Sequence, residues 1–194
     1  MLFRSSTVSP RSGDFAAALG QISSLGSLYQ PLPTLAGQSY FISLWLIVTP
    51  DSSGEATPNV FRVQWNGKNL FAAVNLPDNG WNNLQFIVSA AGSNSVLQFL
   101  FQDVPAALGL DDVSVTTIPT PVLQPVTLKN GSINLSWNSL PGLAYQVQYK
   151  TGVNQSGWTN LGSPILASTS TTSLSDPVGS AAHYYRVIAQ LPNP

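Results

Sequence analysis

The residues best able to do chemistry in this chain are its eight acids and its single histidine. Hydrolysis of a glycosidic bond needs two carboxylates across a cleft, one of them with a raised pKa. Most of the acids instead lie in turn sequences, where aspartate accepts hydrogen bonds from the backbone. A serine nucleophile needs a base, and His183 is the only histidine and has no evident partner. We therefore expect this protein not to be an enzyme.

A metal ion is better supported at Asp111 and Asp112, two adjacent acids at the start of an expected strand. Asp111 alternates with Val113 and Val115, which predicts that its side chain points toward the interior. A buried carboxylate without a partner is costly, and a cation is one such partner. The other interpretation is that Asp111 accepts hydrogen bonds from backbone amides at the start of the strand.

A carbohydrate site is suggested by aromatic and amide side chains on outer faces of strands. In the first long strand the even positions are all apolar, and Trp45 and Phe41 lie on the opposite face. Arg62, Gln64 and Gln85 fall on the outer faces of two later strands. Sugar rings stack on aromatic planes, and their hydroxyls pair with amides and guanidinium groups. Alternatively, a loop or a missing N-terminal strand covers this face and makes Trp45 part of the core.

Strands must position these residues, because no segment shows a convincing helical period. The Asn66-Gly67 pair predicts a tight hairpin between two strands. On the second of these strands, Leu70, Ala72, Val74 and Leu76 are expected to face the core. Strands are expected over 15–19, 28–32, 39–49, 61–65, 70–76, 84–90, 96–102, 111–117, 132–137, 144–150, 158–161, 169–174 and 183–189. Many short strands separated by turn sequences predict sandwich or barrel domains.

A stretch spaced by prolines, Ile118–Pro125, interrupts this pattern and suits an extended connector. The strand pattern restarts after it. We therefore expect two domains, residues 1–118 and 119–194.

The first half resembles the galactose-binding-like jelly rolls of carbohydrate-binding module families 4 and 9. The resemblance rests on the motifs Leu28-Tyr29-Gln30-Pro31-Leu32, Gly37-Gln38-Ser39-Tyr40, Trp81 and Leu110-Asp111-Asp112-Val113-Ser114-Val115. It implies a jelly-roll β-sandwich that lacks the opening strand of the family. It also implies that Asp111, with Asp112, helps to bind a structural Ca2+.

The second half resembles a smaller, immunoglobulin-like sandwich of the fibronectin type III family. The resemblance rests on Leu135-Ser136-Trp137, on Tyr145, Val147 and Tyr149, and on Tyr185, Val187 and Ala189. It implies that Trp137 is buried and that Trp158 is a second packing aromatic. Such domains most often act as spacers or docking modules.

Composition narrows the class of protein further. Only 8% of residues are charged, cysteine is absent and the net charge is −1, with the basic residues scattered. Such a chain is typical of extracellular β proteins, and binding to nucleic acid or insertion into a membrane is not expected. The N-terminus has no apolar signal-peptide core. We therefore expect a removed export signal or a piece of a longer protein.

Two functions follow from these observations. The first is a non-catalytic carbohydrate-binding accessory module of a secreted or cell-surface bacterial protein, with a polysaccharide or glycan as partner. The second is a structural or adhesive spacer segment of a larger surface protein, which self-associates or contacts neighbouring domains and has no small ligand. The first is the preferred hypothesis.

Overall fold

Strands are the regular elements of this protein. The structure, a computed structural model, describes residues 8–50, 54, 58–179 and 182–192. All regular secondary structure in these residues is β-strand. The predicted all-β class is therefore confirmed. The chain divides into two compact units, Met1–Thr117 and Ile118–Pro194, which we describe separately.

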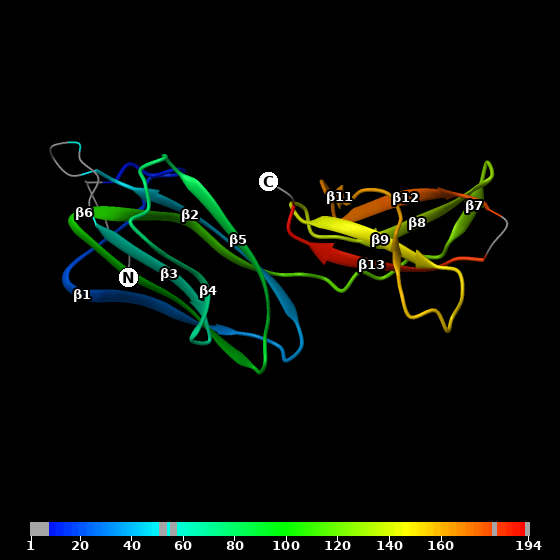
Figure 1. Ribbon diagram of the computed structural model, residues 1–194, viewed down its shortest axis with the longest axis horizontal. Coiled ribbons are helices and arrows are strands. Elements are labelled where there is room, and N and C mark those ends of the chain that lie inside the picture. Colours follow the sequence, from blue (N-terminus) through cyan, green and yellow to red (C-terminus); the bar gives the residue numbers. More distant parts are fainter. Residues whose placement is uncertain (1–7, 51–53, 55–57, 180–181, 193–194) are drawn as a thin grey trace. The chain divides into compact units, whose positions relative to one another are not determined.

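Six antiparallel strands form the first unit (Figure 1). They are β1 (Ala17–Pro33), β2 (Ser39–Val48), β3 (Asn59–Trp65), β4 (Lys68–Val74), β5 (Asn82–Ser89) and β6 (Asn94–Thr117). β6 pairs with β3 up to Asp103 and with β2 from Leu108 onward. β1 follows β6 through both stretches, so these two long strands join the two layers of one curled sheet. The predicted strands 15–19 and 28–32 are thus parts of one strand.

The core lies between the two layers. The even positions of β2 face it as predicted, and Ile42 and Leu44 are fully buried. Phe61 and Val63 of β3 are also fully buried. The predicted hairpin joins β3 to β4 through Asn66 and Gly67, which have φ angles of 50° and 78°. Glycine and asparagine adopt these left-handed angles more readily than other residues.

The face expected for β4 and the residues after it is confirmed for Leu70 and Leu76, which pack against the core, and is wrong for Ala72 and Val74. The pairing of β3 with β4 slips between Val63 and Gln64, and this irregularity exchanges the faces of the following residues. Phe71 therefore packs against Phe61, with ring centroids 6.4 Å apart. Val74, which was expected in the core, is 65% exposed.

Seven strands form the second unit. They are β7 (Thr127–Lys129), β8 (Ser132–Asn138), β9 (Ala144–Lys150), β10 (Thr159–Asn160), β11 (Ile165–Leu166), β12 (Thr171–Pro177) and β13 (Tyr184–Gln190). One sheet has the order β12-β8-β7, and in the other β9 pairs with β10, β11 and β13. Trp137 and Tyr145, one from each sheet, are fully buried and lie 6.3 Å apart between ring centroids. The two small sheets thus pack as a β-sandwich.

A corner in the first unit links the end of β1 to the start of β2. The Tyr40 hydroxyl accepts a hydrogen bond from the backbone N–H of Leu35, at 3.0 Å. Between them Gly37 has a φ of 78°, and its N–H donates to the carbonyl of Ala90. This corner attaches the turn before β2 to the turn after β5.

The second unit repeats the same corner between β8 and β9. The Tyr145 hydroxyl accepts a hydrogen bond from the N–H of Leu140, at 2.7 Å. Gly142 has a φ of 89°, and its N–H donates to the carbonyl of Ala167. The spacing of leucine, glycine and tyrosine is the same in both corners.

Strand pairing around the two corners is also equivalent. Tyr40 lies opposite Val88 where β2 pairs with β5, and Tyr145 lies opposite Ile165 where β9 pairs with β11. The strands before the two corners are β1 and β8. They pair in equivalent register with β6 and β12, the strands that follow Ala90 and Ala167. These pairs are Leu32 with Ser95 and Trp137 with Thr172. Each of the two sandwiches, although they differ in size, therefore contains a corner of the same kind.

Candidate functional site

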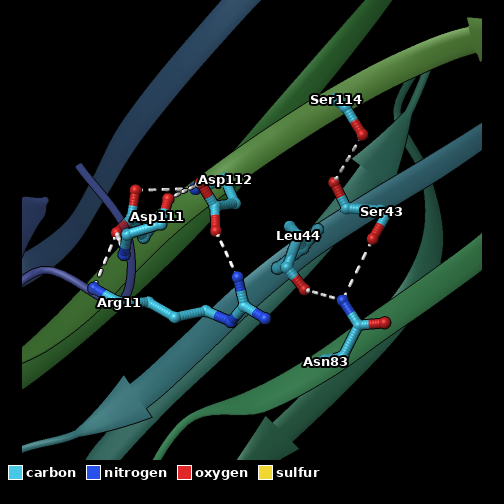
Figure 2. Close-up of polar contacts among 8 residues, drawn as sticks. Arg11, Ser43, Leu44, Asn83, Asp111, Asp112 and Ser114 are labelled. Atoms are coloured by element: carbon cyan, nitrogen blue, oxygen red, sulfur yellow. Dashed lines mark hydrogen bonds and ion pairs between the residues drawn. The ribbon is translucent and has the colours of Figure 1, made fainter.

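Three of the residues expected to bind sugar share one face of the first unit. Phe41 and Trp45 lie on the outer face of β2, and both are half-buried. Gln85 of β5 lies opposite Ser43, which places it between the two aromatic residues on the same face. Asn83 fixes this region by donating to the Ser43 hydroxyl and the Leu44 carbonyl (Figure 2).

The other two residues, Arg62 and Gln64, belong to a different surface. They lie on β3, on the side away from the core. Tyr40 of β2 and Trp65 of β3 pack together across the core, with ring centroids 6.1 Å apart. The inner faces of the two strands therefore look toward each other, and their outer faces look away. The five residues do not form a single site.

The ring of Trp45 is covered by a cation. The guanidinium carbon of Arg11 lies 3.7 Å from the centroid of the ring. Arg11 belongs to the segment before β1, whose Val8 is buried. The described part of the N-terminal segment thus lies over this face of β2, as in the second interpretation of the sequence.

The alternation of Asp111 with the following valines predicted that its side chain points toward the interior. This prediction is wrong. In the pairing of β2 with β6, Ser43 lies opposite Ser114 and Trp45 lies opposite Asp111. One residue of β2 thus faces two residues of β6, which is a β-bulge, and Asp112 there has a φ of 49°. The bulge places Asp111 on the outer face, beside Trp45.

The N-terminal segment holds both carboxylates of the bulge. Asp111 accepts hydrogen bonds from the backbone N–H groups of Arg11, Ser12 and Asp112. Asp112 accepts a hydrogen bond from the Arg11 guanidinium at 2.6 Å (Figure 2). It also accepts one from the Ser12 hydroxyl at 2.6 Å. The hydrogen bond from Ser12 and then the Arg11 guanidinium lower the pKa of Asp112. We call this arrangement the Arg11 clasp.

The Arg11 clasp does not fit a calcium site. Calcium takes six to eight oxygen ligands, whereas all four carboxylate oxygens here accept hydrogen bonds. In the described part of the chain, no group of three or more acidic or histidine side chains is placed to hold a metal. Arg11 supplies the positive charge that the sequence analysis assigned to Ca2+. Calcium binding at Asp111 and Asp112, which no observation here tests, would therefore require Arg11 to leave the two carboxylates.

A cleft of about 630 Å³ opens beside the Arg11 clasp. β1 pairs with one layer at Ala17 and with the other layer at Leu28, so the cleft lies between the layers at the β1 edge. Its apolar walls include Leu97, Phe99 and Leu110, which also belong to the core. The sequence did not indicate this cleft.

Exposed aromatic residues stand at the cleft. Tyr29 is 64% exposed and Phe15 is 49% exposed, and each lines the cleft from a different part of the N-terminal region. The polar residues of the cleft lining include Gln30, Asp111 and Asp112. The cleft is thus mostly apolar, with a few polar residues and two exposed aromatic residues in its lining, and a concave, mostly apolar cleft is the usual form of a small-ligand site.

His183 in the second unit has a partner, contrary to the sequence analysis. Its Nδ1 lies 2.9 Å from Oδ2 of Asp176, and the Tyr185 hydroxyl donates to the same oxygen at 2.6 Å. Burial, the hydrogen bond to Asp176 and the negative charge of Asp176 raise the pKa of Tyr185. The ring centroids of Tyr149 and His183 lie 4.4 Å apart, with the two rings tilted by 35°. Because Asp176 is on β12 and Tyr185 is on β13, this cluster joins the two sheets.

No helix in the described part of the chain has the length and apolar character to span a membrane. No model of a known protein family matches the chain, and no curated protein matches it.

Several solved structures are similar over short parts of their own length. The dimeric latent PorU of Porphyromonas gingivalis is 13% identical with a TM-score of 0.37, over 97% of this chain and 20% of that one. A GH2 β-galacturonidase from Eisenbergiella tayi bound to galacturonate is 10% identical with a TM-score of 0.30, over 86% and 33%. A β-1,2-glucanase from Parabacteroides distasonis is 13% identical with a TM-score of 0.26, over 92% and 32%. The chain spans a third or less of each, and no family or function follows from these scores.

Proposed function

We propose that this chain is a non-catalytic carbohydrate-binding module of a secreted or cell-surface bacterial protein. The cleft at the β1 edge, with Tyr29 and Phe15 exposed beside it, is the observation that carries the proposal. An exposed aromatic ring offers a flat apolar surface to the C–H face of a sugar, and it loses little rotamer freedom on binding.

The polar groups of the cleft favour a neutral glycan. Gln30 can both donate and accept hydrogen bonds, and Asp111 and Asp112, whose oxygens already accept hydrogen bonds from the N-terminal segment, add negative charge to the lining. Arg11 is directed to Asp112 and to the ring of Trp45. An acidic sugar would meet two carboxylates in the cleft and would be repelled.

The β1 edge is poorly suited to a strand from another copy, which is what the adhesive alternative requires. In the described part of the chain β1 pairs only with β6, so its other side is a free edge. Pro31 and Pro33 lie on this strand and have no N–H to donate. Proline on an edge strand hinders pairing with a neighbouring strand.

The proposal is tested by affinity electrophoresis of the full chain in gels that contain a mixed-linkage β-glucan or a galactomannan. We expect retardation, and we expect Tyr29→Ala to weaken binding about fivefold to tenfold through loss of ring stacking. Leu128→Ala, which removes an apolar side chain of the second unit that is 71% exposed, is the control and should bind like the unaltered chain. Trp45→Ala tests the site expected from the sequence and should not weaken binding, because Arg11 covers that ring.

No retardation by any neutral polysaccharide would overturn the proposal. The structural or adhesive spacer would then be the better account, and self-association would be measured next. A loss of binding in Trp45→Ala but not in Tyr29→Ala would move the site to the outer face of β2.

A further inference from the structure

The second unit carries positive charge that its own side chains do not neutralise. It contains three basic residues, Lys129, Lys150 and Arg186, and one acid, Asp176. Asp176 is 5% exposed and contacts His183 and a tyrosine hydroxyl. The basic residues of this unit therefore outnumber its one acid, and their charge is not balanced within the unit. A basic side chain that is held in place on the surface is then available to an external anion.

Two of these cations are fixed on one face of the sheet formed by β10, β9 and β13. Nε of Arg186 donates to the Gln148 side-chain carbonyl at 2.8 Å, and the Gln148 amide donates to Asn160 at 2.8 Å. These contacts form a ladder across three strands. Lys150 lies opposite Tyr184 in the pairing of β9 with β13. This pair is two residues from the pair of Gln148 with Arg186, so both pairs lie on the same face of the sheet.

Trp158 holds the two cations close together. The guanidinium carbon of Arg186 lies 4.5 Å from the centroid of the ring, and Nζ of Lys150 lies 5.0 Å from it. Nζ of Lys150 also donates to the Val153 carbonyl at 2.7 Å. Both long side chains are thus ordered before any ligand arrives, which lowers the entropic cost of binding. We call the surface of Arg186, Lys150, Gln148, Trp158 and Tyr184 the β9–β13 face.

We propose that the β9–β13 face binds an acidic polysaccharide through the carboxylate groups on its sugar rings. A guanidinium group pairs with a carboxylate in bidentate geometry, and an ammonium group beside it can hold a second oxygen or a neighbouring carboxylate. Tyr184 is 44% exposed and offers an aromatic edge to the sugar next to the two cations. This site is separate from the cleft of the first unit and does not depend on it.

The test is affinity electrophoresis of the full chain with polygalacturonate and with the same polymer after full methyl esterification, which removes the negative charge. We expect retardation only by the charged polymer, and we expect it to weaken between 50 and 300 mM NaCl as a result of screening, both concentrations being set by the experiment. Lys150→Gln and Arg186→Gln should each weaken binding roughly threefold to tenfold. Lys129→Gln removes the same charge from the exposed strand β7 and should change binding less than twofold, about the limit for a rim charge.

Equal loss in all three variants, or equal binding to the esterified polymer, would overturn this proposal. Self-association that the Lys150 and Arg186 variants abolish, without polymer binding, would identify a second copy as the partner and would also overturn it. Tyr29→Ala should leave binding to polygalacturonate unchanged. Failure of the cleft and failure of the β9–β13 face are therefore distinguishable.

Discussion

Replacing Gly109 by alanine tests whether the N-terminal segment packs on the outer face of the first unit. Gly109 lies opposite Ile47 in the pairing of β6 with β2. A Cβ atom at this position would lie 2.5 Å from Cγ2 of Ile47 and 2.5 Å from Cγ1 of Val8. Carbon atoms in contact are about 3.5–4.0 Å apart, so a neighbour must move by about 1 Å.

Val8 is the neighbour that should move, because it lies outside the strands whereas Ile47 is held by β-pairing. Overpacking of this kind costs about 1–3 kcal/mol. Expelling the valine side chain would forfeit about 1.5–3 kcal/mol of burial, so the two estimates set the same upper limit. We expect Gly109→Ala to lower the free energy of unfolding of the first unit by about 1–3 kcal/mol, or roughly 4–12 °C in melting temperature.

Urea unfolding followed by circular dichroism, fitted as two transitions for the two units, measures this change. Gly92→Ala is the matched control, because a Cβ there meets nothing within 4 Å. In a Val8→Ala background the cost of Gly109→Ala should fall by about 1 kcal/mol, since the clashing Cγ1 is gone. The same cost in both backgrounds, or a Gly109→Ala variant as stable as Gly92→Ala, would refute this packing.

Three further predictions concern the remaining polar contacts. The pKa of Tyr185 is raised in the folded protein, so its contribution to the free energy of unfolding should be retained below the unfolded tyrosine pKa of about 10 and lost as the pH rises above it. Urea midpoints measured from pH 8 to 11, about the range in which tyrosine ionises, should therefore fall less steeply in Tyr185→Phe than in the unaltered chain. Calcium should not raise the melting temperature of the unaltered chain but should raise that of Arg11→Ala; a rise in the unaltered chain that Asp111→Ala abolishes would contradict this. Tyr145→Phe leaves the partly buried N–H of Leu140 without its acceptor and should cost about 1–3 kcal/mol in urea unfolding; an unchanged midpoint would show that water replaces the hydroxyl.

Alternation in the sequence predicted those strands that keep a regular pairing. The core rows of β2 and β3 follow directly from it, as does the hairpin at Asn66. Predictions failed after each bulge, because one extra residue exchanges the two faces of a strand. This is why Val74 is exposed and why Asp111 lies on the outer face.

The cleft and the Arg11 clasp depend on contacts between residues far apart in the chain. Leu28 pairs with Phe99, and Arg11 reaches Asp112, across stretches that no local pattern relates. One signal was available for Arg11, since a basic residue in a charge-poor chain needs an anion or an aromatic ring. The same reasoning applies to His183, whose partner is the only acid of the second unit.

The repeated corner shows that one arrangement of hydrogen bonds closes two sandwiches of different size. The turn after Leu35 and the turn after Leu140 present the same donors and the same tyrosine at the same spacing. Because most of these bonds use backbone groups, the corner needs only a tyrosine and a glycine at fixed positions, and the side chains of the flanking strands are free to differ. The spacing Leu-x-Gly-x-x-Tyr at the start of a strand is therefore a local signal for this turn that domains with different cores can carry.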